Sequence, residues 1–244
     1  MTSKSLVYLI PSFLSEDSVE TIPVYIIDAV KNCTVIFAEN ERTARRFLKS
    51  ICKACLPLRQ EIVIDDYEWF TIHKAEAEQL AMFKQKIKEE RNIAIISEAG
   101  CPGIADPGQI LVHAAQQMDV TIKPLVGPSS ILLALMASGM NGQQFQFVGY
   151  LPIDALPRTN KLKELEEESA RKKCTQIFIE TPYRNNQLLE TILKTCKPAT
   201  QLCIASELTS KNEFIKTRSI EQWKNEKVDL HKKPVIFLLL ASSK

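Results

Sequence analysis

The strongest indication of fold is the stretch Asn92-Ile-Ala-Ile-Ile-Ser-Glu-Ala-Gly-Cys-Pro-Gly-Ile-Ala-Asp-Pro-Gly108. Its apolar run, residues 93–96, predicts a buried strand that leads into a long turn containing Gly100, Gly103 and Gly108. Glycine suits such a turn because it tolerates positive φ and lets a ligand approach the main chain closely. Ligands of open α/β sheets bind at the carboxyl ends of strands, so we expect the ligand here.

Apolar runs alternate with helical patterns on both sides of this turn. Strands are expected at residues 6–10, 34–38, 61–64, 93–96, 121–126, 145–148, 177–179, 202–205, 213–217 and 235–241. The alternation predicts an α/β fold in which helices flank parallel strands. We divide it into two α/β domains, residues 1–118 and 119–244, with a cleft between them to which polar strand ends contribute.

A second glycine-containing segment, Gly127-Pro-Ser-Ser130, precedes a helix predicted over residues 131–138. That helix is apolar on every side and is followed by Gly139, so we expect it to be buried. The hydroxyls of Ser129 and Ser130, together with the free N–H groups of its first turn, would suit a ligand rich in hydrogen-bond acceptors.

Composition excludes several classes of protein. With 45% hydrophobic and 25% charged residues in 244, the chain is typical of a globular protein rather than a disordered one. No apolar run reaches the ~18–20 residues of a membrane span, and no signal-peptide pattern is present, so we expect a cytoplasmic protein without a membrane partner. The seven cysteines include one C-x-x-C pair, Cys52 and Cys55, without a second pair at zinc-site spacing. We therefore expect reduced cysteines and no metal.

One predicted helix carries five cations at helical spacing on one face: Arg42, Arg45, Arg46, Lys49 and Lys53. A solvated surface helix and a contact for a phosphate-bearing partner explain this pattern equally well.

Five segments, in consistent order along the chain, resemble motifs of the tetrapyrrole methylase superfamily of S-adenosylmethionine-dependent enzymes. Residues 97–108 resemble S-D-A-G-x-P-x-x-x-D-P-G, and the other four are Gly127-Pro-Ser-Ser130 with the helix that follows, Phe147-Val-Gly-Tyr-Leu-Pro152, Glu180-Thr-Pro-Tyr-Arg184 and Ala205-Ser-Glu-Leu-Thr209. The likeness is greatest to the branch that 2′-O-methylates a cytidine of small-subunit ribosomal RNA.

The chain departs from that branch on the side expected to handle the methyl acceptor. The first loop reads Pro11-Ser-Phe-Leu-Ser-Glu16 in place of P-T-P-I-G-N, and Ala38-Glu-Asn-Glu-Arg42 stands in place of A-E-D-T-R. Glu98 replaces an aspartate, and Lys232-Lys233-Pro234 precedes the final strand where G-E is usual.

The resemblance implies that S-adenosylmethionine binds in the cleft between the domains, mostly through main chain. The implied cofactor-binding residues are Pro11, Gly100, Cys101, Ile104, Ala105, Gly127, Ser129, Ser130, Phe178, Ala205, Leu208 and Pro234. It also implies a homodimer.

For the acceptor side, Glu39 is the candidate general base for a hydroxyl, and Arg42 is the candidate phosphate contact. The alternative is that Glu39 is an acid at the start of a helix and Arg42 a surface residue. Three functions remain open: 2′-O-methylation of ribosomal RNA, methylation of a tetrapyrrole or other small molecule, and cofactor binding without catalysis in an RNA-binding or assembly factor.

Overall fold

The computed structural model describes residues 5–55, 62–72 and 76–241. The chain divides into two compact units, Met1–Ser129 and Ser130–Lys244. Each unit is built around one five-stranded sheet. Two α/β units were expected, and both are present.

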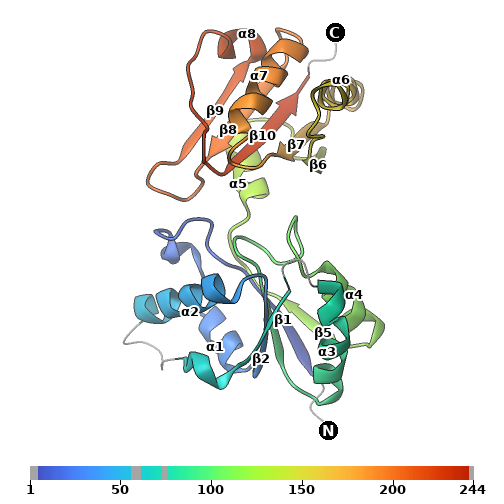
Figure 1. Ribbon diagram of the computed structural model, residues 1–244. Helices are drawn as coiled ribbons and strands as arrows, with labels where there is room; N and C mark the ends of the chain where they lie inside the picture. The colour runs from blue at the N-terminus through green and yellow to red at the C-terminus, as the bar shows by residue number, and fades with distance from the viewer. Residues whose placement is uncertain (1–4, 56–61, 73–75, 242–244) are drawn as a thin grey trace. The chain divides into compact units, whose positions relative to one another are not determined.

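The first unit contains a parallel sheet in the order β3-β2-β4-β1-β5 (Figure 1). The strands are β1 (Leu6–Ile10), β2 (Val35–Ala38), β3 (Glu68–Thr71), β4 (Ile93–Ile96) and β5 (Thr121–Pro124). The strands β2 and β4 are wholly buried, which explains why they read as continuous apolar runs rather than alternating ones.

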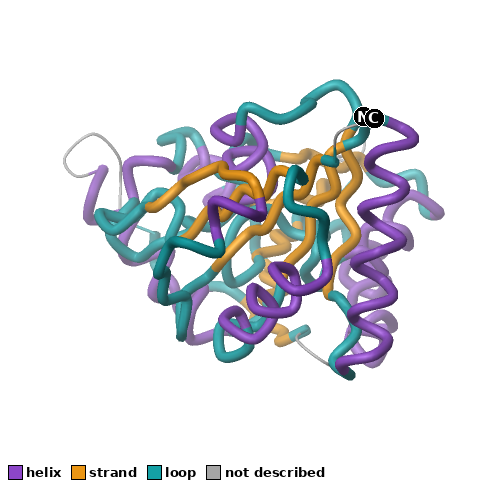
Figure 2. Tube along the Cα trace, turned by 90° about the horizontal axis from the view of Figure 1, so that it is seen from above, coloured by secondary structure: helices purple, strands orange, loops and turns teal. Residues whose placement is uncertain are grey.

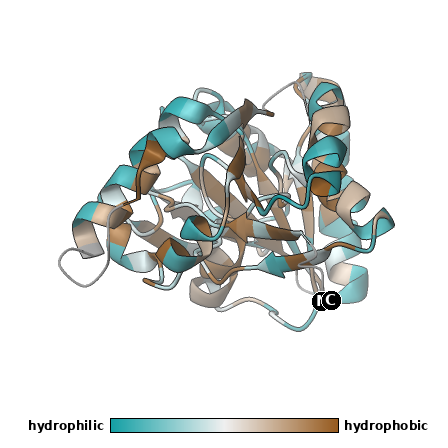
Figure 3. Cartoon of the chain, turned by 90° about the horizontal axis from the view of Figure 1, so that it is seen from below, coloured by the Kyte–Doolittle hydropathy of each residue, from teal (hydrophilic) through white to brown (hydrophobic). Residues whose placement is uncertain are grey.

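Helices cover both faces of this sheet. Helices α1 (Ile26–Lys31) and α2 (Glu41–Cys55) contribute to the core on one face, and α3 (Glu76–Lys88) and α4 (Gln109–Gln117) to the core on the other. Hydrophobic colouring concentrates on the strands, whereas the outer sides of the helices are hydrophilic (Figure 3).

The strand order places a topological switch point between β1 and β4. The chain leaves β1 toward the face of α1 and leaves β4 toward the face of α4, although the two strands are neighbours in the sheet. Divergent connections open a crevice at the carboxyl ends of such a pair, and this is where α/β sheets bind ligands. The long glycine-containing turn follows β4 at this point.

The second unit has a mixed sheet in the order β6-β7-β10-β8-β9. Its strands are β6 (Phe145–Tyr150), β7 (Thr175–Ile179), β8 (Gln201–Ser206), β9 (Phe214–Ser219) and β10 (Val235–Leu240). Strand β10 runs antiparallel to both of its neighbours, β7 and β8. Helices flank these strands (Figure 2): α6 (Ala155–Lys172), α7 (Asn185–Thr195) and α8 (Ile220–Trp223) form one core with the sheet, and α5 (Ser130–Ser138) contacts β9 and β10.

Three expectations need correction. The domain boundary falls after Ser129 rather than after residue 118, because β5 pairs with β1 and belongs to the first sheet. The third strand is β3, not residues 61–64: Ile64 begins a 3-10 turn, and residue 61 lies outside the described residues. Helix α5 is not buried on every side, since Leu132 is 51% exposed and Met136 is 79% exposed.

Candidate functional site

The turn after β4 is fastened to the end of β1. Ser12 N–H donates to Gly100 O over 2.9 Å, and Gly100 N–H donates to Ser12 O over 3.1 Å. The hydroxyl of Ser12 donates to Ser97 O over 2.8 Å. The loop Pro11–Glu16 lacks the glycine usual in the resembled branch, yet its main chain closes the switch point by a short antiparallel bridge.

The end of β5 is joined to the same place. A Cβ on Gly127 would lie 2.2 Å from Pro11 Cβ, so only glycine fits against that ring. The Cys101 thiol donates to Pro128 O over 3.6 Å. The loops that follow β1, β4 and β5 therefore form one connected cradle of Pro11, Gly100, Cys101 and Gly127, all four of which were expected to bind cofactor.

The turn itself exposes two further expected residues. Ile104 is 54% exposed, and Ala105 is exposed with φ at +63°. A left-handed conformation in a residue with a Cβ costs about 1 kcal/mol or more and is common at functional sites. Gly103 N–H donates to Pro107 O over 3.2 Å, which holds the base of the turn closed while Ile104 and Ala105 project from it.

Three carboxyl groups gather where β2 and β4 end side by side. Glu39 follows β2 and is buried, and its Oε2 accepts a 2.9 Å hydrogen bond from Glu98 N–H in the turn after β4. Glu98 Oε1 accepts the Thr43 hydroxyl. Burial, followed by the negative charges of Glu39 and Glu98, raises the pKa of Asp106 to about 7. Asp106 is therefore a carboxyl group that gains or loses a proton near neutral pH.

Asp106 could not be recognised as a titrating group from the sequence, because nothing in the sequence shows that β2 pairs directly with β4. That pairing, Ala38 opposite Ile96, brings the residues after the two strands together.

Asn40, which stands where the resembled branch has aspartate, begins helix α2. Its Oδ1 accepts Arg42 N–H over 3.0 Å and Thr43 N–H over 3.4 Å. Asparagine and aspartate cap helices about equally well, so this substitution preserves the local structure. Arg42, the expected phosphate contact, is exposed in the first turn of the capped helix.

The five cations on one face of α2 fall into two groups, those with an ion pair and those without one. Arg45 is bonded to Glu41 and Asp65, each over 2.7 Å, and lies 4.7 Å from the centroid of the Trp69 ring; Arg46 is paired with Glu16. Arg42, Lys49 and Lys53 are exposed and form no ion pair with the described part of the chain. Only these three of the five cations remain for an anionic partner.

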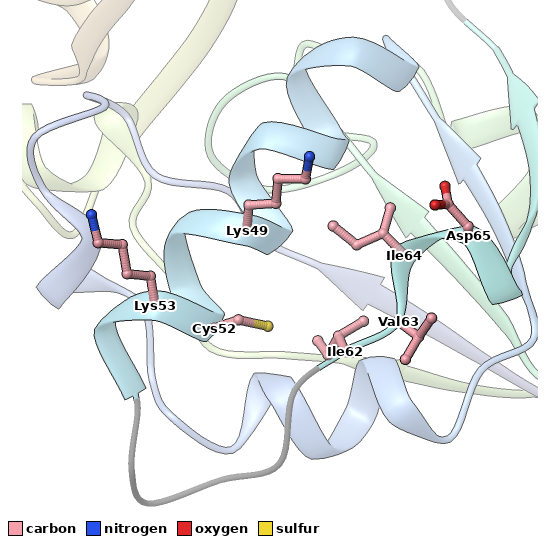
Figure 4. Close-up of a pocket in the computed structure, with 7 residues that line it drawn as sticks. All are labelled: Lys49, Cys52, Lys53, Ile62, Val63, Ile64 and Asp65. Atoms are coloured by element: carbon pink, nitrogen blue, oxygen red, sulfur yellow. The ribbon is translucent and has the colours of Figure 1, made fainter.

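A cavity of about 560 Å³ adjoins the later turns of α2 (Figure 4). Lys49, Cys52 and Lys53 line it from the helix, and the segment 62–65 lines it from the opposite side. Since α2 starts beside the carboxyl end of β2 and returns along the sheet, its last turns lie away from the cradle. We therefore do not include this cavity in the candidate site.

The cysteines and histidines offer no metal site within the described ranges. Cys33 and Cys196 are buried, and burial raises the pKa of each thiol to about 12. A protonated thiol is a poor nucleophile and a poor ligand. Cys52 is half-buried and forms no disulfide with another described cysteine, whereas the side chain of Cys55 and all of His73 lie outside the described structure.

In the second unit the expected cofactor residues collect at one end of three neighbouring strands. Ala205 lies near the end of β8, Leu208 follows it, and Pro234 precedes β10, with Glu207 N–H donating to Pro234 O over 3.0 Å. Phe178 is opposite Phe237 in the register of β7 and β10, and its ring is fully buried against that of Phe237, so its side chain is part of the core. Ser130 begins α5.

A buried carboxylate in this unit has a cationic partner. Glu180, directly after β7, accepts 2.6 Å hydrogen bonds on Oε1 from Arg184 Nη2 and from Thr181 N–H. Its side chain is fully buried, whereas Arg184 is 31% exposed. The E-T-P-Y-R motif thus forms an ion pair across the start of α7, which indicates a structural role.

The sequence profile of the tetrapyrrole (corrin/porphyrin) methylases matches residues 17–223. The chain belongs to this family. It is accordingly classed as a methyltransferase. Among the solved structures, the methyltransferase CobJ has a TM-score of 0.62 at 15% identity, covering 98% of this chain and 95% of that one. Cobalamin biosynthesis precorrin-6Y methylase (cbiE) from Archaeoglobus fulgidus has a TM-score of 0.57 at 16% identity, covering 98% and 99%. These likenesses show that the two-domain fold is shared.

The relatives found by sequence similarity are named differently from these two solved structures. "Ribosomal RNA small subunit methyltransferase I" of Buchnera aphidicola subsp. Schizaphis graminum is 28% identical over 98% of this chain and 79% of that protein. The protein of the same name from Vibrio cholerae is 35% identical over 60% of this chain, and the match spans half of that relative's length. No helix in the described part of this chain is long and apolar enough to cross a membrane.

Proposed function

We propose that this chain transfers a methyl group from S-adenosylmethionine to a ribose 2′-hydroxyl of small-subunit ribosomal RNA. The observation that carries the proposal is the match, over 98% of the chain, to a relative named as a small-subunit ribosomal RNA methyltransferase. The likeness to CobJ and to the precorrin-6Y methylase is confined to fold, because their identities are 15% and 16%.

The residues of the cradle fit the chemistry of the proposed cofactor. Gly127 packs against the Pro11 ring and Gly100 against Leu14 and Pro128, so the loops meet closely, and exposed Ile104 offers an apolar surface for a purine ring. The hydroxyls of Ser129 and Ser130 form no hydrogen bond with other described residues, so both are available for a ribose or a carboxylate. When bound, S-adenosylmethionine supplies a methyl group on a positively charged sulfur, which leaves as a neutral thioether. Within the second unit, Ala205, Leu208, Pro234 and the main chain at Phe178 are our proposed cofactor contacts.

We assign the transfer of the proton from the methyl acceptor to the three neighbouring carboxyl groups of Glu39, Glu98 and Asp106. The Asp106 carboxylate, which at a pKa of about 7 is matched to neutral pH, would accept the proton of the 2′-hydroxyl as the 2′-oxygen bonds to the methyl carbon and the carbon–sulfur bond breaks. Glu39, our candidate base from the sequence, acts here as a positioning residue: it anchors the turn through Glu98 N–H, and its charge keeps the Asp106 carboxylate basic.

The assignment of Asp106 and Glu39 can be tested by pH profiles. Asp106→Asn should abolish transfer at every pH. Glu39→Gln removes a negative charge near Asp106 and should move the rise of the rate to lower pH while activity persists. If Glu39→Gln is inactive and Asp106→Asn keeps most of its activity, Glu39 is the base and our assignment is wrong.

RNA contacts are assigned to Arg42, Lys49 and Lys53 on α2, the cations of that face without an ion pair among the described residues. Phosphates attract unpaired cations strongly, and Arg42 lies in the first turn of the helix, beside the carboxyl groups of Glu39 and Glu98. We further propose that the protein is cytoplasmic and acts as a homodimer; light scattering that shows only monomer would contradict the dimer.

One alternative has support from particular residues. A cofactor-binding factor without catalysis was suggested by the altered loop at Pro11–Glu16 and by Asn40. The structure favours the enzyme, because Ser12 still closes the loop onto Gly100 and Asn40 still caps α2.

Calorimetric titration of S-adenosylmethionine and S-adenosylhomocysteine tests the cofactor, and transfer of labelled methyl to small-subunit ribosomal RNA tests the acceptor. Gly100→Val should abolish cofactor binding. Gly139→Val is the matched control, because Gly139 has φ at +70°, like the +71° of Gly100, and has no atom within 4 Å of its added Cβ. Equal binding by wild type and Gly100→Val would remove the cradle from the cofactor site.

A further inference from the structure

Two loops of the second unit are bound together into one surface. The turn after β7, residues 181–184, and the segment before β10, residues 229–234, are linked by Lys232 N–H donating to Pro182 O over 3.0 Å. Next to it, Asn185 Nδ2 donates to Lys233 O over 2.8 Å, and Leu230 N–H donates to Asn186 Oδ1 over 2.8 Å. Such a network fixes the side chains on its outer side in place.

That outer side carries two aromatic rings and an ammonium group. Tyr183 is 70% exposed, and His231 and Lys232 are exposed beside it. The Tyr183 and His231 rings meet edge to face, with centroids 6.0 Å apart and planes at 75°. Each ring restricts the other, so both are held out to solvent in a preferred orientation. We call Tyr183, His231 and Lys232 the aromatic platform.

The backbone of the platform is strained. Lys232 has φ at +60°, a left-handed conformation that glycine adopts without strain and lysine does not. A residue held in this region costs about 1–3 kcal/mol, and such residues cluster at ligand sites. The conformation aims a long cationic side chain out of the segment that carries His231.

The charges around the platform nearly cancel. Lys233 is paired with Glu207 over 3.0 Å, and Arg184 is paired with Glu180. The carboxylate of Asp229 accepts hydrogen bonds from Asn186 Nδ2 over 2.8 Å and from His231 N–H over 3.0 Å. These bonds hold the pKa of Asp229 below its ordinary value, so Asp229 stays charged. Lys232 remains the cation without an ion pair among the described residues here. A surface with two rings, one cation without an ion pair and one carboxylate held by neutral donors suits a base with a single phosphate better than a phosphate-dense duplex.

We propose that the aromatic platform stacks one unpaired base of the RNA, with Lys232 on the adjoining phosphate. Single-stranded RNA is recognised chiefly by stacking of splayed bases on Tyr, His and similar side chains. Pro234, proposed above to contact cofactor, lies two residues from Lys232 in the chain. This inference rests on the proposed function for its choice of RNA.

The test compares two labelled probes by fluorescence anisotropy: a twelve-nucleotide oligoadenosine, and an abasic chain with the same number of phosphates. Tyr183→Ala should weaken oligoadenosine binding by roughly tenfold and leave abasic binding unchanged, because stacking requires a base. His231→Ala should act in the same direction, and Tyr183→Phe should retain affinity. Phe145→Ala is the control, since Phe145 is an exposed aromatic residue of the same unit, 41% exposed, and is outside the platform.

Each outcome decides one of the two proposals. Equal losses on both probes, or no loss on oligoadenosine, would overturn the platform. Wild type that binds oligoadenosine through Tyr183 but methylates no RNA would keep the platform and remove the proposed function. If Tyr183→Ala methylates ribosomal RNA fully and its affinity is unchanged, the platform is overturned and the proposed function stands. A surface that instead captures a protein would show no difference between Tyr183→Ala and wild type on either RNA probe.

Discussion

The two units treat the polar residues that follow their strands in opposite ways. In the first unit, Asp106 lies with two like charges, Glu39 and Glu98, and burial and those charges raise its pKa to about 7. In the second unit, the buried carboxylate of Glu180 is bonded to Arg184 over 2.6 Å. A carboxyl kept among like charges is available to exchange a proton, whereas one neutralised by a cation is structural.

The glycines differ between the units as well. A Cβ added to any of the four glycines of the first unit would lie 3.7 Å or less from another heavy atom. A Cβ added to Gly139, Gly142 or Gly149 of the second unit would meet no atom within 4 Å. In the first unit close packing bears on Gly127 and Gly108, where an added Cβ would lie 2.2 Å and 3.3 Å from its neighbour, whereas Gly139 and Gly149 of the second unit have a positive φ in open space. The parallel sheet explains this contrast, because all its carboxyl ends meet at one edge and their loops must share limited space.

The largest effect is expected from Arg184→Ala in the second unit. It leaves the fully buried Glu180 carboxylate without its cation, and we expect a loss of about 3 kcal/mol in the free energy of unfolding, at the low end for buried pairs because Arg184 is 31% exposed. The double variant Glu180→Leu/Arg184→Met should recover most of the loss in urea unfolding. If Arg184→Ala lowers the free energy of unfolding no more than the loss of an ordinary surface ion pair does, the pair of Glu180 and Arg184 is not structural. The proposed contrast with Asp106 would then fail.

Gly127→Ala should come next. Its Cβ would overlap the Pro11 ring at 2.2 Å, and forced overpacking costs about 1–3 kcal/mol. Thermal unfolding should show a clear fall in Tm together with weaker cofactor binding.

Gly142→Ala is the control for the glycine contrast. It meets open space, and Gly142 has no positive φ, so the change should be neutral or slightly stabilising through the unfolded state. Similar losses for Gly127→Ala and Gly142→Ala would contradict the difference between the units.

The sequence predicted the two-unit α/β fold and the turn at the switch point because both depend on local patterns: apolar runs, and glycine and proline in register. It misplaced the third strand because Ile62 and Ile64 look like a strand, whereas the true edge strand β3 is only partly buried. The edge position gives β3 a weak hydrophobic pattern.

Contacts between distant segments were the part that sequence could not supply. Asp65 neutralises Arg45 from 20 residues away, and the charges of Glu39 and Asp106 interact because β2 lies beside β4. Neither pairing leaves a signal in a single sequence. The platform was missed for the same reason, since Tyr183 and His231 are 48 residues apart in the chain and meet only in the fold.

Asp106 should make the stability of the protein depend on pH. Because the folded pKa of Asp106, about 7, lies above the ordinary 3.8, the folded state holds this proton more tightly than the unfolded state does. Its stabilising contribution is complete below pH ~4 and is lost as the pH rises through 7. Asp106→Asn should therefore raise Tm at pH 8 and lose that advantage near pH 4. Glu78→Gln, a neutralisation at an exposed site, should show no such pH-dependent difference; parallel curves for Asp106→Asn would mean that Asp106 is an ordinary acid.

The smallest effects are expected on the cationic face of α2, where the contrast between paired and unpaired charges recurs within one helix. Each phosphate contact that is lost lowers the slope of log affinity against log salt by about one, so Lys49→Glu and Lys53→Glu should each flatten that slope for RNA and weaken binding several-fold. Lys88→Glu is matched to them, because Lys88 is exposed on α3, which packs on the opposite face of the same sheet. Arg45→Gln should leave the slope nearly unchanged, since Glu41 and Asp65 already neutralise that guanidinium. If Arg45→Gln and Lys88→Glu flatten the slope as much as Lys49→Glu does, RNA responds to net charge alone and α2 is an ordinary solvated helix.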